Sequence, residues 1–238
     1  VFTCSRSCTP PAWTSTCTSR ASTPSHAWWP RSRNVSGTGD HRNNYAHAGI
    51  DAHAHAAVRR AERRFHAHYD SYCYLPLYIF CGRHLLAAKL RRSNIDASAG
   101  AVEEIARIIA QIRHRWPKTR ILLRGDSGFA RETLMAWCET NRVDFLFGLA
   151  RNERLEAAIK PELMLASLDS IRSGRPARRF RDFMWSTIDS WSHNRRVVGK
   201  AEVTGGEANP RFVVTSLKPA DIAAQYLYET IYCARGEM

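Results

Sequence analysis

Strand-like and helix-like segments alternate between residues 72 and 149, and this order constrains the fold more than any other feature. Aromatic and β-branched residues over 72–80 predict a strand. Residues 85–90 predict a second strand, which returns across a turn at Gly82 to form a hairpin. Pro76 lacks a backbone N–H, so we expect the first of these strands to lie at a sheet edge or to carry a bulge.

An amphipathic helix follows the hairpin. Apolar residues recur at helical spacing from Val102 to Trp116, with Ser98 as the predicted N-cap and Pro117 as the stop. Residues 120–126 then form a short apolar run bounded by a proline and a glycine, which is typical of a buried strand.

The alternation continues with a predicted helix over 130–141 and a predicted strand over 143–149. This order predicts an α/β fold with a partly parallel sheet, which the preceding hairpin makes mixed. The patterns of the later residues predict a weak helix, three short strands of an antiparallel β insertion and a last helix, at 153–173, 180–188, 196–203, 211–216 and 219–238.

The first 64 residues differ from the rest, because they contain no Leu, no Lys and no Gln. They show no reliable periodicity, so we expect an irregular segment. Three interpretations remain open: a disordered basic tail, GC-rich coding DNA read in a displaced frame, or a metal module. The last would use Cys4, Cys8 and Cys17 with His26, although no CxxC pair supports it.

Charge points to a polyanionic partner. The 238 residues contain 35 Lys and Arg against 22 Asp and Glu, a formal net charge of +13, and nucleic acid is the first candidate. There is no apolar run of about 20 residues and no signal-peptide layout. The seven cysteines form no framework, so we expect a reducing cytoplasm. Three basic pairs could contact phosphate or simply be solvated: Arg91-Arg92, Arg178-Arg179 and Arg195-Arg196.

Asp126 is the position most suggestive of chemistry. It ends a predicted buried strand and is followed by Ser127 and Gly128. In open α/β sheets, sites gather at the carboxyl ends of strands, and a carboxylate there suits Mg²⁺ or Mn²⁺. Gly128 would allow a backbone or ligand to approach closely. The competing interpretation is that Asp126 only caps the next helix.

Other polar residues are weaker candidates, and we interpret them as turn, surface or solvating groups rather than ligands: Asp70, His66, His68, His84, Glu103 and Glu104. No G-x-S-x-G elbow and no glycine-rich phosphate loop is present in the sequence.

Four segments resemble bacterial insertion-sequence transposases of the DDE type, in particular the transposase DDE domain group 1 family: residues 75–93, 121–129, 212–216 and 232–238. The resemblance extends from about Phe65 to Met238. It implies a ribonuclease-H-like fold with a β insertion, at about 175–217, before the last catalytic helix. It also implies DNA as partner, a homodimer, and a location at the bacterial nucleoid in the cytoplasm.

The same resemblance implies metal-dependent phosphoryl transfer, in which three carboxylates hold two Mg²⁺ or Mn²⁺ ions. Asp126 corresponds to the second acid. Tyr232 and Arg235 match the start of the signature that carries the third acid, whose Glu would directly follow Met238. Glu237 is off that register by two helical positions, a rotation of about 200°, so it is not a substitute.

The first acid of the family lies in an Asp-Ala-Thr-Asp-Asp-like motif. Asp51-Ala52 begins like that motif, but the resemblance stops there and resumes only at about Phe65. We therefore expect residues 1–64 to be irregular, the first acid to be missing, and the sheet to lack a central strand.

These expectations together describe residues 65–238 as a degenerate, truncated DDE catalytic domain that is inactive in cleavage and joining. Two alternatives stay open at this point. One is a non-catalytic basic protein that binds DNA, and the other is a ribonuclease-H-like metal nuclease.

Overall fold

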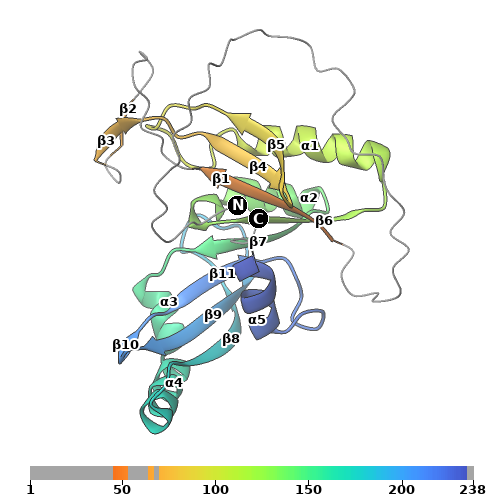
Figure 1. Ribbon diagram of the computed structural model, residues 1–238. Helices are drawn as coiled ribbons and strands as arrows, with labels where there is room; N and C mark the ends of the chain where they lie inside the picture. The colour runs from red at the N-terminus through yellow and green to blue at the C-terminus, as the bar shows by residue number, and fades with distance from the viewer. Residues whose placement is uncertain (1–44, 53–63, 67–69, 235–238) are drawn as a thin grey trace. The chain divides into compact units, whose positions relative to one another are not determined.

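The computed structural model shows a mixed β-sheet with helices on both faces (Figure 1). It describes residues 45–52, 64–66 and 70–234. For residues 45–52 only the backbone is described.

The strands, in chain order, are β1 (Tyr45–Ala52), β2 (Arg64–His66), β3 (Ser71–Cys73), β4 (Leu77–Cys81), β5 (His84–Lys89), β6 (Arg120–Gly125), β7 (Asp144–Leu149), β8 (Ala177–Trp185), β9 (Arg195–Thr204), β10 (Glu207–Ala208) and β11 (Arg211–Thr215). The helical segments are α1 (Ala101–Arg115), η1 (Ser127–Phe129), α2 (Glu132–Thr140), α3 (Glu153–Ala158), α4 (Lys160–Ser173), α5 (Ala224–Tyr226) and η2 (Leu227–Tyr232).

Within the described residues, nine strands share one sheet in the order β10-β9-β11-β7-β6-β1-β4-β5, with β8 paired to β9. The pairs β1–β6 and β6–β7 are parallel, and the other pairs are antiparallel. Three antiparallel strands in chain order, β1, β4 and β5, thus adjoin two parallel strands that are connected through helices. This arrangement confirms the predicted mixed, ribonuclease-H-like fold class.

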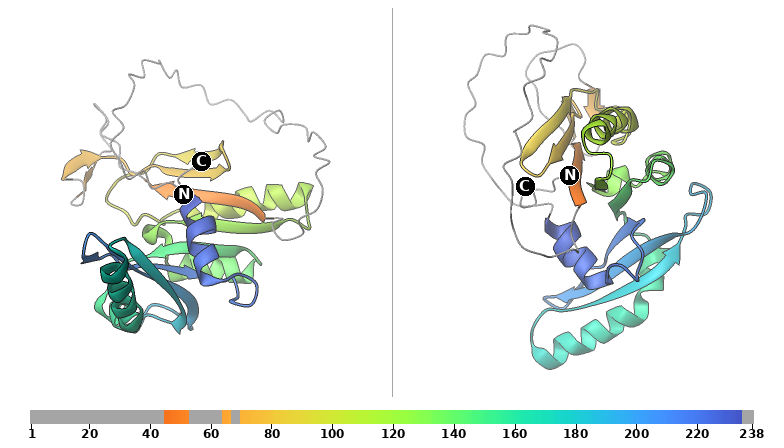
Figure 2. Two further views of the ribbon diagram at one scale, coloured as in Figure 1. Left: turned by 60° about the horizontal axis from the view of Figure 1, so that its bottom comes forward. Right: turned by 90° about the vertical axis from the view of Figure 1, so that its right-hand side faces the viewer.

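The central strand β6 is buried on both faces, with the apolar Ile121 and Leu123 on one face and Leu122 beside the buried Arg124 on the other. Ile121 and Leu123 belong to the larger core cluster, which also contains the inner residues of α1 and α2. Leu122 belongs to the opposite cluster, together with Leu227 and Ile231 of η2. Figure 2 shows α1 and α2 together on one side of the sheet and the α5 region on the other. A strand covered on both faces reads as the continuous apolar run seen in the sequence.

The antiparallel insertion extends this same sheet. Strand β11 pairs with β7 from Phe212↔Leu149 to Thr215↔Leu146, and β9 and β8 follow outward. Helix α4 packs on β8 and β9, where it covers the outer part of the sheet. The three predicted strands of the insertion are therefore confirmed, and the short β10 adds a fourth.

One prediction about the sheet was wrong. We expected residues before 65 to be irregular and a central strand to be absent, but β1 lies between β6 and β4. Its residues are mostly alanine, histidine and glycine, so its place depends on backbone pairing with two neighbours rather than on an apolar side-chain pattern. The rest of the segment, 1–44 and 53–63, lies outside the described residues. The proposed metal module of Cys4, Cys8, Cys17 and His26 lies there too.

Three local expectations also differ from the structure. Helix α1 begins after Gly100, whose φ of 71° is left-handed, while the Ser98 hydroxyl bonds the Asp96 carboxylate instead of capping the helix. Pro76 lies just before β4, which is an inner strand and not the expected edge, although the expected irregularity is present as a register shift between Ile79 and Phe80. The last predicted helix is shorter in the described residues, since it comprises only α5 and the π-helical η2.

Across the described part of the chain, none of the helices combines the length and the apolar character needed to cross a membrane.

Candidate active site

Asp126 directly follows β6, at the carboxyl end of that strand, as the sequence predicts. Its side chain is half-buried, and Oδ1 accepts a hydrogen bond of 2.8 Å from the Gly128 backbone N–H. Asp126 thereby acts as the N-cap of the one-turn helix η1. The capping interpretation is correct as geometry, and it also fixes the carboxylate at the strand end.

The turn after Asp126 is tightly packed at Gly128. A Cβ built on Gly128 would lie 2.9 Å from the Ala97 Cβ and 3.0 Å from Asp126 Oδ1. The close approach that we expected for a backbone or ligand is therefore made by the protein's own loop between β5 and α1. This contact holds the Asp126 turn against residues 96–98.

Another acidic residue, Asp96, lies near this turn and has a structural role. The Asp96 carboxylate accepts from Arg131 Nη2 at 2.9 Å and from the Ser98 hydroxyl at 2.7 Å. Burial alone would raise the pKa of Asp96, but the hydrogen bonds from Ser98 and Arg131 outweigh it and hold that pKa below its usual value. Asp96 therefore stays ionised and ties the loop to the start of α2.

Strand β1 brings a third acidic position to the same edge of the sheet. The parallel register pairs Gly49 with Arg124, so two residues further along it aligns Asp51 with Asp126. On its other side Asp51 pairs with Tyr78 of β4. Asp51, which corresponds to the start of the first-acid motif of the family, is thus beside Asp126, the candidate second acid. Both positions lie at the carboxyl ends of two parallel strands.

Segment η2, which ends at Tyr232, the first residue of the signature, covers the face of the sheet next to this edge. We call it the signature segment. Tyr232 is buried, and its hydroxyl lies over Gly148 of β7, close to the backbone between Asp126 and Ser127. Arg124, two residues before Asp126, is also buried and donates from Nη1 to the Ile231 carbonyl at 2.8 Å. Arg235, the other matched signature residue, lies outside the described residues.

Arg124 and Gly148 are site residues that our sequence analysis did not single out. The available signal was an arginine inside an otherwise apolar run, 121–125. A charge in a buried strand requires a specific partner, and here the partner is a backbone carbonyl of the signature segment.

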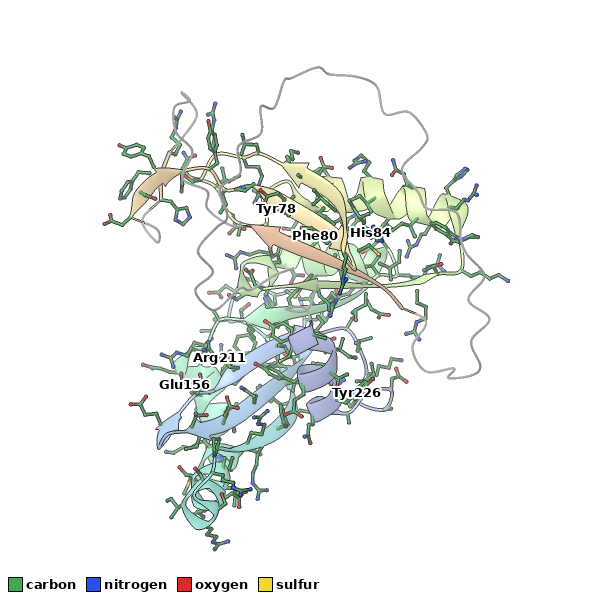
Figure 3. The ribbon with its side chains drawn as sticks, viewed as in Figure 1. Tyr78, Phe80, His84, Glu156, Arg211 and Tyr226 are labelled. Atoms are coloured by element: carbon green, nitrogen blue, oxygen red, sulfur yellow. The ribbon has the colours of Figure 1, made fainter. Side chains whose placement is uncertain are left out.

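The weaker candidates do not gather into a site. Asp70 is exposed in a turn with φ of 44°, and His84 is exposed on β5, where Figure 3 shows it near the β4 hairpin. His66 lies on the separate β2–β3 ribbon. His68 is not among the described residues. In the described part of the chain no three His, Cys, Asp or Glu side chains lie close enough to hold one metal ion together.

The basic pairs have structural partners. Arg91 is buried and donates to the Leu75 and Ala97 carbonyls, and burial lowers its pKa despite the nearby charge of Asp96. Arg195 and Arg196 are buried among carboxylates and carbonyl groups, as described below for Arg195. Phosphate contact by these three arginines is therefore not supported by their burial.

The second basic pair, on β8, is partly exposed and ion-paired. Arg178 bonds Glu229 at 2.8 Å, and Arg179 bonds Asp169 at 2.7 Å. The hydrogen bond that Arg178 donates to Glu229 raises the pKa of Arg178 against the opposing effect of burial. Each guanidinium group already bonds a carboxylate, so a phosphate would have to compete with that partner.

Comparisons with known proteins give three findings. No curated protein sequence matches the chain. Among solved structures, a piggyBac transposase in a synaptic complex with hairpin DNA is similar, with 11% sequence identity and a TM-score of 0.42. That similarity covers 82% of this chain and 39% of the other, so the chain spans well under half the length of that protein.

The model of one protein family matches a much larger share of the sequence than any single motif. Its match runs over residues 50–238, which begins in β1, one residue before Asp51, and includes the Asp126 turn and η2. The chain belongs to the transposase DDE domain group 1 family.

Proposed function

We propose that this chain provides the metal-binding core of a DNA transposase, with Asp126 and Asp51 as ligands for Mg²⁺ or Mn²⁺. The observation that carries the proposal is the parallel register of β1 and β6, which pairs Gly49 with Arg124 and, continued by two residues, places Asp51 opposite Asp126 just after β6. Enzymes of the DDE transposase family use divalent metal ions. Carboxylate oxygens are the ligands that these ions prefer.

The residues around Asp126 suit that role. The Gly128 N–H occupies one carboxylate oxygen at 2.8 Å, and this bond orients the carboxylate at the strand end. Asp126 is half-buried, so its carboxylate is partly removed from bulk water. Electrostatic attraction to a cation is stronger there than in bulk water. When bound, the metal ions activate the attacking oxygen and stabilise the leaving oxygen in phosphodiester chemistry.

The substrate class that we propose is DNA. The formal net charge of +13 favours a polyanion, and a basic protein attracts the phosphate backbone irrespective of base sequence. We also propose that the chain recognises the ends of an insertion sequence and assembles into a homodimer. The support for both is the family membership of the chain.

We also propose that the chain is inactive in strand cleavage and transfer. The sequence departs from the first-acid motif directly after Ala52, where histidine and alanine replace the expected acids. The reaction uses two ions that carry four positive charges, and residues 53–55 supply none of the further acids of that motif. DNA binding without strand transfer is therefore the expected behaviour.

Metal binding gives the direct test. Titration of the full chain with Mn²⁺, followed by calorimetry or by water-proton relaxation, is expected to give a site that weakens about tenfold or more in Asp126→Asn. Asp169→Asn is the matched control, since it removes an exposed carboxylate on α4, far along the sheet order from Asp126. Equal Mn²⁺ affinity in the wild type and Asp126→Asn would contradict the proposal.

DNA binding and catalysis separate the alternatives. Affinity for a labelled duplex is expected to fall by about 10³-fold between about 50 and 200 mM salt, with little dependence on sequence. Incubation with Mg²⁺ or Mn²⁺ and insertion-sequence ends is expected to leave the DNA uncut. Metal-dependent joining that Asp126→Ala abolishes would overturn the inactivity. Cutting of arbitrary DNA without joining would favour a nuclease.

A further inference from the structure

The signature segment η2 and the Asp126 turn meet at Gly148 of β7. A Cβ built on Gly148 would lie 2.5 Å from Tyr232 Oη, 3.0 Å from the Ser127 nitrogen and 3.2 Å from the Asp126 carbonyl carbon. Real Cβ atoms essentially never come within 3.0 Å of another heavy atom in such contacts. Only glycine therefore leaves room for Tyr232 and for the peptide that follows Asp126.

A second contact joins the same two elements from the side of β6. Arg124 is 4% exposed, and its Nη1 donates to the Ile231 carbonyl at 2.8 Å. Because Arg124 and Asp126 are two residues apart in an extended segment, they lie on one face, about 7 Å apart along the chain. The strand that ends in Asp126 is thus bonded to the residue that precedes Tyr232.

We propose that Gly148 and Arg124 are positioning residues that set the place of η2 against the Asp126 turn. This inference rests on the proposed function, in which Asp126 is a metal ligand. The Arg124 bond holds η2 to the sheet, and the contact of Tyr232 with Gly148 sets how closely it approaches. Together they fix the direction in which the Asp126 carboxylate faces.

An added methyl group at Gly148 cannot be absorbed by a flexible side-chain end. Tyr232 is a large side chain that is only 8% exposed, and the Ser127 nitrogen belongs to the backbone. The Gly148→Ala variant must therefore move either η2 or the Asp126–Ser127 peptide. Either shift changes how η2 packs against the peptide that follows Asp126, and we expect this change to disturb the setting of the Asp126 carboxylate.

The first test measures Mn²⁺ affinity in the full chain. Gly148→Ala is expected to weaken Mn²⁺ binding about tenfold, the size typical of outer-shell changes at metal sites. Gly199→Ala, in β9 of the insertion, is the matched control, because its Cβ would also be too close to a neighbour, at 2.6 Å from Ile159 Cγ2. The control is expected to lower stability but to leave Mn²⁺ affinity unchanged. Equal Mn²⁺ affinity in Gly148→Ala and wild type would overturn the proposal.

A rescue variant separates positioning from general destabilisation. Tyr232→Phe removes the oxygen that lies nearest to the added methyl group. The double variant Gly148→Ala/Tyr232→Phe is expected to bind Mn²⁺ several-fold more tightly than Gly148→Ala alone, a non-additive effect of residues in contact. Additive losses from the two changes would count against the proposal.

Arg124→Met gives a test by the sign of its effect. Removing a positive charge from the strand that leads to a cation site favours the cation electrostatically, so a role limited to charge predicts tighter Mn²⁺ binding. Loss of the bond to Ile231 instead predicts weaker binding, since η2 is released. Tighter binding by Arg124→Met would overturn the positioning role of that residue.

Hydrogen–deuterium exchange provides a readout that needs no metal. Gly148→Ala is expected to speed exchange in peptides covering 126–131 and 227–234 more than Gly199→Ala does, with reversal by Tyr232→Phe. Equal exchange in the two alanine variants would overturn the positioning role. If the wild type binds no Mn²⁺ at Asp126, the proposed function fails, and the exchange data still decide whether Gly148 and Arg124 position η2.

Discussion

The β6–β7 core and the β8–β9 part of the sheet differ in burial and in the contacts that hold them, since β8 contains no fully buried residue. Phe145 and Phe147 of β7 are fully buried and stacked, with ring centroids 5.3 Å apart. By contrast, Arg195 at the start of β9 is 3% exposed and bonds two carboxylates of α2. Apolar residues of β9 and β11 share the core cluster of Phe145 and Phe147, and the insertion is attached in addition to α2 by a buried cation.

The Arg195 network is specific in its geometry. The guanidinium donates to Glu132 at 2.6 Å and to Glu139 at 2.7 Å, and it lies 5.5 Å from the ring centroid of Trp191. The two carboxylates remain about a quarter to a third exposed, so water can still solvate them if the arginine is lost. An ionic attachment of this kind is directional, while the aromatic core tolerates no loss of volume.

The largest expected effect is in the core. Phe147→Ala removes a fully buried ring and leaves a cavity between β7 and the helical layer, so the free energy of unfolding should fall by about 3–5 kcal/mol. Urea unfolding followed by circular dichroism measures this change. Met184→Ala, at a side chain 62% exposed on β8, is the control and should change stability by less than about 0.5 kcal/mol. A small effect at Phe147 would contradict the tight packing described for the core.

A smaller loss is expected at the insertion. Arg195→Met keeps much of the side-chain volume but removes every bond to Glu132 and Glu139, so unfolding should become easier by about 2 kcal/mol. Chemical denaturation of this variant can be compared with Arg179→Met, which removes an exposed pair with Asp169 and should cost under about 1 kcal/mol. If both variants lose equally little, the buried cation does not hold the insertion.

Acid should weaken the insertion before the core. The hydrogen bond from Arg195 lowers the pKa of Glu132 from 4.5 to about 2, against a smaller opposing effect of burial. Because the folded-state value is depressed, this stabilisation is complete above about pH 4.5 and disappears as the pH falls toward about 2.

The size of this acid effect should be about 1 kcal/mol, because the Glu132 side chain is partly screened by water. Unfolding midpoints measured across that pH range should therefore decline less steeply in Glu132→Gln than in the wild type. An identical decline in both proteins would show that Glu132 does not contribute.

The apolar part of the fold could be predicted because its pattern is local. The predicted strand over 72–80 is in fact two strands of different sheets, β3 and β4. Strand β5, α1, β6, α2 and β7 were all predicted close to their observed bounds. Each has either a helical repeat of apolar residues or a continuous apolar run, and these patterns report burial directly. The carboxyl-end position of Asp126 followed from the bounds of β6.

The elements that were missed depend on contacts distant in sequence. Strand β1 contains few residues with high strand propensity, and its pairing with β4 and β6 supplies the order that its side chains do not predict. Arg124 was not singled out in the sequence and Arg195 was interpreted as solvated or phosphate-binding, because their partners are 107 and 63 residues away. The alignment of Asp51 with Asp126 could be seen only once the parallel register was known.

The backbone bonds between β11 and β7 have a mechanical consequence. The insertion is not a separate lobe on a tether, because its strands continue the sheet that ends in Asp126. Swinging it as a hinged arm would mean breaking a ladder of paired residues from Leu146 to Leu149. Any twist imposed on the outer strands by a large ligand would instead be passed, strand by strand, to the edge where Asp126 lies.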